Sequence, residues 1–195
     1  MSSPMTALMD SSWNLFTRWL GTEWPEGLRL LNPPASEDDI GWLEALIGYP
    51  LPRDLADCLR IHDGQRPNLG VLFDGCEFLS TRRIADEWSV WKKLLDDGHF
   101  EGQRSEPEDG IRPSWWNAAW IPFTYDGAGN HLCLDLDPAE GGRSGQVITM
   151  SHDDPTRERV AASLGEWFEA YVAGVLAGRY VHAEEYDGIV RREDV

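Results

Sequence analysis

The sequence predicts an α+β fold in a single domain, with short strands of a mixed or mainly antiparallel sheet flanked by N-terminal, central and C-terminal helices. Apolar residues recur at helical spacing near both ends and in the middle, whereas short alternating runs joined by hairpin-length connections concentrate between residues 120 and 150. Helices and strands therefore occupy separate stretches, which is typical of α+β rather than βαβ architecture. The length of 195 residues fits one domain.

Helix periodicity and capping signals indicate five helical segments. Ser36 with Asp39 three residues later resembles a capping box, and Ser163 with Glu166 forms a full one. Gly48 stands just past a helix end, and Pro52 occupies a first helical position. The expected segments are 13–20, 37–47, 52–62, 81–95 and 164–177.

Three runs indicate the main strands, at 120–123, 131–137 and 146–150, with one or two shorter strands within 69–79. The glycines and Asn of 126–130 suit a hairpin loop between the first two runs. The second run alternates strictly, which predicts one core face and one face at least partly in contact with solvent. The core face would carry Leu132, Leu134 and Leu136, and the other His131, Cys133, Asp135 and Asp137.

The ends of the chain and one internal segment read as poorly structured. We expect residues 1–11 to be a flexible N-terminal tail, 12–180 to be the folded domain and 181–195 to be a charged C-terminal tail. Residues 96–113 are polar, acidic and contain Gly and Pro, which predicts an exposed, mobile loop.

Acidic residues outnumber basic ones, with 34 Asp and Glu against 17 Lys and Arg and a net charge of −17. A surface of this kind does not grip nucleic acid or an anionic membrane, both of which require clustered Lys and Arg. Hydrophobic residues make up 42%, including ten Trp, which is enough for a substantial core. A partner held by electrostatics should therefore be basic.

Three cysteines without C-x-x-C spacing indicate reduced thiols rather than a disulfide framework or a thiolate zinc site. The N-terminal residues lack the basic and apolar regions of a secretory signal, and no run approaches the ~20 apolar residues of a membrane span. These observations predict a cytoplasmic location.

No catalytic, metal or cofactor motif stands out. The five histidines are scattered, and the G-x-S-x-G, G-x-x-x-x-G-K-[ST] and G-x-G-x-x-G patterns do not occur. Oxygen ligands around two turns raise the possibility of calcium, but their spacing departs from the twelve-residue loop and favours ordinary turns and a solvated acidic rim. We predict no catalytic residue, metal or cofactor; the oxygen ligands are Asp126, Asn130, Asp135, Asp137 and Glu140.

Trp115, Trp116 and Trp120 have two interpretations. Exposed, they would form a stacking platform for sugars or bases. Buried, they would fill the core and rim of the sheet, which is the favoured interpretation because ten Trp cannot all serve a ligand. Arg112 is the only cation near them in the sequence.

The order of several short motifs resembles the SUKH superfamily, which joins fungal cell-wall-synthesis regulators of the Smi/Knr type to bacterial toxin-immunity proteins. Each motif is weak alone, but their order and spacing agree with the family across roughly residues 12–180. The matching stretches are 40–44, 47–48, 51–52, 61–65, 120–123, 126–130, 132–138, 145–148 and 163–167.

The resemblance implies a protein-binding module without enzymatic activity, and in bacterial members an immunity protein that neutralises a nuclease-like toxin. The acidic composition agrees, because an acidic protein can occlude the basic surface that a nuclease needs. The candidate partner-binding residues are Asp126, Asp135, Asp137, Glu140, Glu106, Glu108 and Asp109, with Glu101 in the same loop.

Two other functions remain open. A small-molecule or carbohydrate-responsive regulatory protein would use the Trp115, Trp116 and Trp120 region. An enzyme would require His131, Cys133 and Asp135 or Asp137 to line one cleft within hydrogen-bonding distance.

Overall fold

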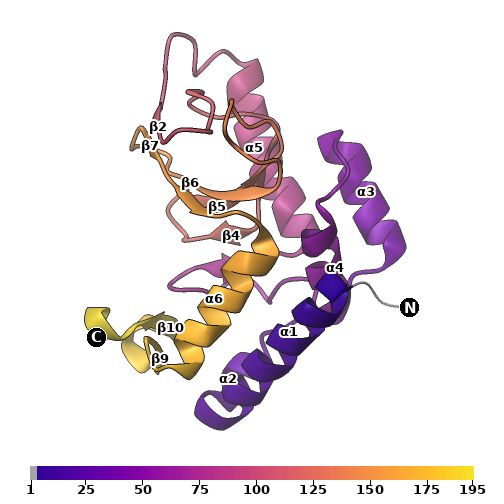
Figure 1. Ribbon diagram of the computed structural model, residues 1–195, viewed down its shortest axis with the longest axis vertical. Helices are drawn as coiled ribbons and strands as arrows, with labels where there is room; N and C mark the ends of the chain where they lie inside the picture. Colours follow the sequence, from indigo (N-terminus) through magenta and orange to yellow (C-terminus); the bar gives the residue numbers. More distant parts are fainter. Residues whose placement is uncertain (1–3) are drawn as a thin grey trace.

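A computed structural model describes residues 4–195, with side chains from Met9 onward. Its helices and short strands form an α+β domain, which confirms the predicted fold class. The helices are α1 (Pro4–Glu23), α2 (Pro25–Leu28), α3 (Glu37–Ile47), α4 (Arg53–Ile61), α5 (Thr81–Asp96) and α6 (Leu164–Leu176). Figure 1 shows α1 and α6 side by side below the sheet, with α5 and α3 above them. None of the helices described is long and apolar enough to cross a bilayer.

The central sheet is antiparallel and has the strand order β3-β5-β6-β8. Its register pairs Ile121 with Leu134 and Leu134 with Val147, so apolar residues align across the strands. The strands are β3 (Trp120–Pro122), β5 (His131–Asp135), β6 (Gln146–Met150) and β8 (Arg159–Ala161).

Three two-stranded pairs surround this sheet. β1 (Glu77–Phe78) pairs with β4 (Thr124–Tyr125), and β2 (Glu106–Pro107) runs parallel to β7 (Thr156–Arg157). β9 (Tyr180–Ala183) and β10 (Gly188–Arg191) form the C-terminal hairpin, which contains the 3-10 turn η1 (Glu184–Tyr186) and precedes η2 (Arg192–Asp194). The two antiparallel pairs and the central sheet make the structure mainly antiparallel.

The helix signals in the sequence correspond to real caps. The Ser36 side chain accepts a hydrogen bond from the Asp39 N–H, and the Asp39 carboxylate accepts one from the Ser36 N–H. Gly48 ends α3 with a positive φ of 79°, a conformation that costs glycine least. The Ser80 and Ser163 side chains cap α5 and α6 by accepting from the Arg83 and Glu166 N–H groups, so local chemistry defines these starts. The full capping box predicted for Ser163 and Glu166 forms only this half, without a return bond to the Glu166 carboxylate. α4 begins one residue later than expected, with Pro52 as its N-cap.

Helix α1 and helix α6 build the main core with the loop that precedes β1. Trp13 and Phe168 have ring centroids 4.7 Å apart, and Phe16 and Phe73 lie 5.9 Å apart. The Tyr171 hydroxyl donates a hydrogen bond of 2.7 Å to the Leu72 carbonyl, which satisfies the polar end of a buried ring. This aromatic cluster fixes α6 against the loop.

Both ends of the chain are more ordered than the sequence suggests. α1 begins at Pro4 and continues through Gly21, so residues 4–11 belong to a helix, while residues 1–3 of the expected tail lie outside the described residues. Most of the expected 181–195 tail belongs to the C-terminal hairpin. Ile189, fully buried there, explains the order: its N–H donates to the Val71 carbonyl.

The 96–113 segment is largely exposed but contains fixed points. Glu106 and Pro107 form β2, and Ile111 is buried. The Glu106 N–H donates to the Pro155 carbonyl and the Glu108 N–H to the Arg157 carbonyl. These long-range bonds attach the loop to β7, which lies between β6 and β8 in the chain.

The second strand run has the predicted core face, where Leu134 is fully buried and Leu132 partly covered. The expectation that the opposite face is partly in contact with solvent is wrong, because His131, Cys133 and Asp135 are buried as well. α5 covers the His131 face through Trp91, and α6 covers the leucine face through Trp167 beside Phe123. Helices on both sides leave neither face fully exposed.

Candidate functional site

Five of the predicted acidic residues gather on one side of the sheet. The Ala139 N–H donates to the Gly110 carbonyl, which joins the loop after β5 to the segment after β2. This contact brings the end of β5 next to β2 and its loop. We call this surface the acidic rim; it consists of Glu106, Glu108, Asp109, Asp137 and Glu140, with Glu101 exposed earlier in the same loop.

Members of the acidic rim differ in how they are held. Asp137 forms an ion pair of 2.9 Å with Arg112 and accepts a hydrogen bond from Asn117. The Glu108 carboxylate accepts a hydrogen bond from the Arg159 N–H, which secures β2 beside β8. Glu106, Asp109 and Glu140 are exposed, and the structure gives their carboxylates no ion pair or hydrogen bond within residues 4–195. These three are the carboxylates best placed to meet a partner.

Asp135 does not belong to the exposed surface, contrary to the prediction. It is 0% exposed and accepts hydrogen bonds from Gln146 Nε2 and the Asp137 N–H. Burial raises its pKa above the ordinary value, although these hydrogen bonds act in the opposite direction. Its role is to fix the turn after β5.

Asp126 lies at the opposite end of β5 from the acidic rim, in the turn between β4 and β5. Its carboxylate accepts hydrogen bonds from the Ala128 and Asn130 N–H groups and from the Asn130 side chain. Partial burial raises its pKa, but these bonds outweigh it and hold the pKa below its ordinary value. Asp126 is therefore an ionised turn residue, separate from the other predicted binding residues.

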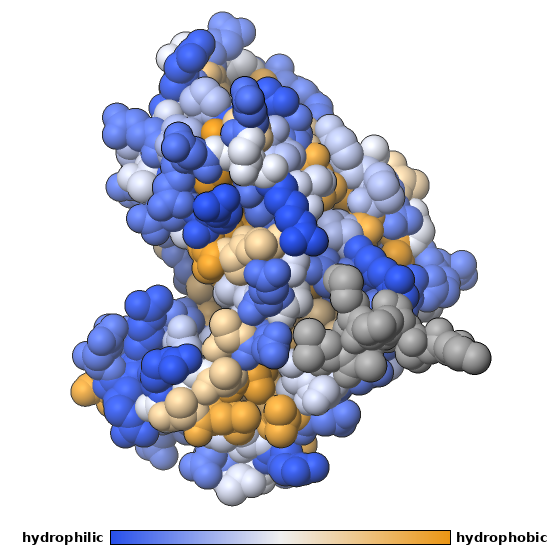
Figure 2. All heavy atoms as spheres, in the orientation of Figure 1, coloured by the Kyte–Doolittle hydropathy of each residue, from blue (hydrophilic) through white to orange (hydrophobic). Residues whose placement is uncertain are grey.

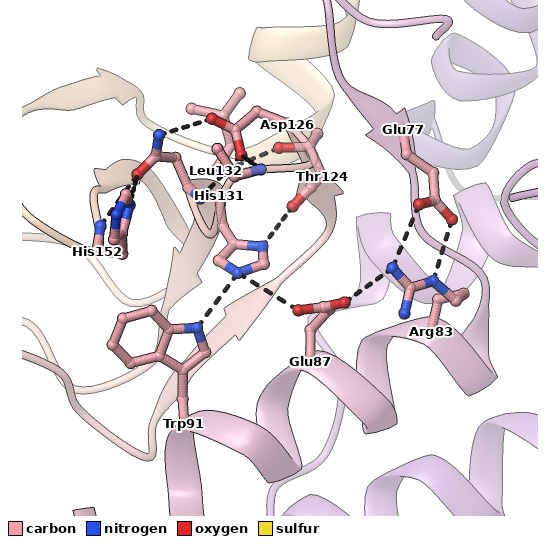
Figure 3. A network of polar contacts seen from close by, with 11 residues as sticks. Glu77, Arg83, Glu87, Trp91, Thr124, Asp126, His131, Leu132 and His152 are labelled. Carbon is pink, nitrogen blue, oxygen red and sulfur yellow. Dashed lines mark hydrogen bonds and ion pairs between the residues drawn. The ribbon is translucent and has the colours of Figure 1, made fainter. Parts of the chain in front are cut away.

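A polar network connects this turn to α5 (Figure 3). Arg83 forms ion pairs with Glu77 at 3.2 Å and Glu87 at 2.8 Å. The other Glu87 oxygen lies 3.8 Å from His131 Nε2, and Trp91 Nε1 donates to the same nitrogen at 3.3 Å. The network holds α5 against the β4–β5 hairpin.

The network defines the protonation of His131. Its Nδ1 lies 2.8 Å from the Thr124 carbonyl, which can only accept, so Nδ1 carries the proton and Nε2 accepts from Trp91. Burial lowers the pKa of His131 to about 4, against the opposing effect of the Thr124 hydrogen bond. Burial also raises the pKa of Glu87, despite its ion pair with Arg83. His131 is thus neutral at pH 7.

A shallow groove of about 490 Å³ lies above this network. We call it the α5–hairpin groove. Its walls combine aromatic, aliphatic and polar side chains, and Glu87 supplies its only carboxylate. Such a groove suits a side chain of a partner, because aromatic walls and a carboxylate accept an apolar or cationic group. The lining includes Glu87, Val90, Phe100, Trp115, Tyr125 and His152.

The tryptophan platform is mostly core, as the favoured interpretation predicted. Trp116 and Trp120 are buried, and only Trp115 borders the α5–hairpin groove. Arg157, not Arg112, is the cation beside them: its guanidinium lies 5.4 Å from the Trp115 ring centroid and 6.0 Å from that of Trp120. No stacking platform of three exposed rings exists in this region.

Arg157 is a structural residue that the sequence analysis missed. It is 0% exposed, and its terminal nitrogens donate to the carbonyls of Ser151, Asp154, Thr156 and Trp115. Burial lowers its pKa below the ordinary value. Its contact with residue 115 joins segments 42 residues apart, and no local sequence pattern signals this role.

The residues proposed for an enzyme do not form a cleft. Cys133 and Asp135 are both fully buried, and burial raises the pKa of the Cys133 thiol, which keeps it protonated. Within residues 4–195, no group of three or more His, Cys, Asp or Glu side chains is arranged to hold a metal ion. The surface here offers exposed carboxylates, a groove with aromatic walls and a hydrogen-bonded turn.

The chain is similar to known proteins over most of its length. The model of the SMI1 / KNR4 family (SUKH-1) matches residues 34–170. The chain is 27% identical to a "Glucan synthesis regulatory protein" of Neurospora crassa, with 97% of this chain and 42% of that protein aligned. It is 28% identical to "Cell wall biosynthesis/cell cycle regulator smi1" of Schizosaccharomyces pombe, with 94% of this chain and 39% of that protein aligned.

A "KNR4/SMI1 homolog" of Eremothecium gossypii is 31% identical, with 93% of this chain and 38% of that protein aligned. The chain thus spans about two fifths of the length of these relatives. Family members carry the names of regulators rather than enzymes. Since the family model covers well over half of the residues, the chain belongs to the SMI1/KNR4 (SUKH-1) family.

Proposed function

We propose that the chain is a non-enzymatic binding module that recognises a basic protein through the acidic rim. The observation that carries this proposal is the group of exposed carboxylates at Glu106, Asp109 and Glu140, which have no internal ion pair or hydrogen bond within residues 4–195. A charge of −17 favours attraction of a basic partner over distances of a Debye length, about 10 Å at 0.1 M salt.

In its specific form, the proposal is that the partner is a nuclease-like toxin in the cytoplasm and that the chain is an immunity protein. A nuclease presents a basic surface to phosphates, and the acidic rim is complementary to such a surface. Binding there would exclude the nucleic acid by occupying its site.

A second candidate comes from the names of the fungal relatives. They are called regulators of glucan synthesis and cell-wall biosynthesis, and they align with nearly all of this chain. On this alternative, the same acidic rim binds a basic segment of the cell-wall-synthesis machinery. The carbohydrate alternative has less support, because Trp116 and Trp120 are buried.

The test compares two variants with equal charge. The rim variant Glu106→Gln/Asp109→Asn/Glu140→Gln removes three free carboxylates of the acidic rim, and the control Glu23→Gln/Glu169→Gln/Glu185→Gln removes three elsewhere. We expect basic nuclease domains to bind the rim variant about tenfold more weakly at 50 mM NaCl, with little change for the control. The difference should shrink at 300 mM NaCl because salt screens exposed charges.

Growth rescue provides the functional readout. Cells that express the bound nuclease should survive when they co-express the natural chain, and survive less well with the rim variant. Affinity that is the same at low and high salt, or equal weakening by both variants, would contradict recognition by the acidic rim. If no nuclease binds and a basic segment of a cell-wall-synthesis enzyme does, the second candidate is correct.

A further inference from the structure

The C-terminal hairpin concentrates positive charge in this acidic chain. In the β9–β10 register, Tyr180 faces Arg191, and the Arg192 N–H donates to the Arg179 carbonyl at 2.9 Å. Arg179 and Arg192 therefore lie beside each other just outside the paired strands, and Arg191 precedes Arg192 in the chain. Like charges directly opposite one another are destabilising.

These arginines line a cavity of about 660 Å³ at the end of α6. We call it the basic pocket; its lining is Gly178, Arg179, Tyr180, Arg191, Arg192 and Glu193. A glycine on α6 makes room for its wall. A Cβ at Gly174 would lie 2.8 Å from the Tyr180 ring and 3.2 Å from an Arg179 terminal nitrogen, which is too close for any larger residue without movement.

Two guanidinium groups of the basic pocket are held through their inner nitrogens. Arg191 Nε donates to Asp74 at 3.0 Å, and Arg192 Nε donates to the Gly178 carbonyl at 2.7 Å. The second bond also neutralises the negative end of the α6 dipole. The terminal nitrogens remain: the Glu193 carboxylate, on a side chain that is 78% exposed, lies 3.9 Å from one terminal nitrogen of Arg191. Within residues 4–195, Arg179 has no ion pair.

A second cavity, of about 410 Å³, adjoins the basic pocket and shares Gly178, Tyr180 and Arg192 with it. Its far wall combines the apolar side chains of Trp19, Leu176 and Val181 with the polar side chains of Glu23 and His182. Figure 2 shows hydrophobic residues over the C-terminal part of α6 and the adjacent α1, next to the hydrophilic surface of the hairpin. One ligand can therefore reach both a cationic and an apolar surface.

We propose that the basic pocket binds a phosphorylated Ser or Thr of a peptide segment, with a neighbouring apolar side chain of the peptide in the adjoining groove. Guanidinium groups match phosphate oxygens through paired hydrogen bonds, and a phosphate monoester carries a charge of about −1.5 to −2. The net charge of −17 repels anions, so a ligand that binds here must carry a concentrated negative charge to be held by the arginines. The site is separate from the acidic rim and extends the proposed function.

The test follows the arginine Nε–Hε signals of the full chain by NMR. The ligands are a phosphoserine peptide with an adjacent leucine, the same peptide without phosphate, and free phosphoserine. We expect the phosphopeptide to shift the Arg191 and Arg192 signals and to bind about tenfold more tightly than phosphoserine, while the unphosphorylated peptide leaves them unchanged. Equal binding of both peptides would overturn the phosphate site, and equal binding of phosphopeptide and phosphoserine would overturn the peptide part.

Variants test the basic pocket independently of the NMR signals. Arg179→Gln removes a cation without an internal ion pair, so we expect unchanged thermal stability and about tenfold weaker phosphopeptide binding. Arg192→Lys keeps the charge but loses the planar, paired N–H donors of the guanidinium group, so it should also weaken phosphopeptide binding. Arg104→Gln, an exposed arginine in the 96–113 segment, is the matched control. Equal weakening by Arg179→Gln and Arg104→Gln would mean that general charge attracts the peptide, and would overturn the proposal.

Discussion

The buried imidazole of His131 makes the stability of the domain depend on pH. Burial lowers its folded pKa to about 4, whereas the unfolded value is about 6.5. Between these values the unfolded chain binds a proton that the folded chain excludes, so stability falls as pH falls from about 6.5 toward 4. The full difference corresponds to roughly 3 kcal/mol, and Glu87 reduces it because its raised folded pKa favours protonation of the folded state.

His131→Gln tests this coupling, because Gln retains a donor for the Thr124 carbonyl but does not titrate. We expect urea unfolding, followed by circular dichroism, to show that the natural chain loses about 1–3 kcal/mol between pH 7 and 4.5. The variant should lose less over the same range. His99→Gln, at an exposed histidine, should behave like the natural chain. A natural chain and His131→Gln variant with the same pH profile would exclude His131 as the source.

Single residues show where sequence reasoning stops. The alternation of β5 was correct, but it could not show that both faces are covered, because that depends on the distant Trp91 and Trp167. Asp135 was therefore assigned to an exposed surface, although it is buried beside Gln146 of β6. Asp126 was identified as a turn residue from Gly127, Gly129 and Asn130, since an Asx turn is a local feature.

Among the elements, the C-terminal hairpin contributes to the stability of the whole domain. Ile189 is 0% exposed, its carbonyl accepts from the Gly75 N–H, and its N–H donates to the Val71 carbonyl. We expect Ile189→Ala to reduce the free energy of unfolding by about 2–4 kcal/mol through loss of burial and a residual cavity. Chemical denaturation measures this loss. Val195→Ala, at a side chain 61% exposed, is the control and should change it by less than about 0.5 kcal/mol.

A hairpin that is only a loose tail would leave Ile189→Ala as stable as the natural chain.

The sequence predicted the helices better than this hairpin, for a physical reason. The capping box at Ser36 and the N-cap bond at Ser163 act over three residues, so they are readable locally. β10 is held by residues 71–75 and β2 by β7, and such pairings depend on segments far apart in the chain.

For the whole molecule, the net charge of −17 makes folding depend on ionic strength. Carboxylates crowd together more in the folded state, so repulsion opposes folding, and salt reduces it as the Debye length falls from about 30 Å at 0.01 M to about 8 Å at 0.15 M. We expect the thermal midpoint to rise by about 2–4 °C over this range, which corresponds to about 1 kcal/mol for a chain of this size.

Clustering of charge determines how much of this effect each variant removes. The rim variant and its control both carry three fewer charges than the natural −17. The Ala139–Gly110 hydrogen bond joins the segments that carry Asp109 and Glu140, whereas the control carboxylates lie on three separate elements, α1, α6 and η1. Coulomb energy rises as distance falls, so the rim variant should be the more stable of the two at 10 mM NaCl. It should also gain less from added salt. A midpoint that falls with NaCl in calorimetry would mean that attractive pairs such as Arg191 with Asp74 outweigh the repulsion, and that the acidic rim costs the fold nothing.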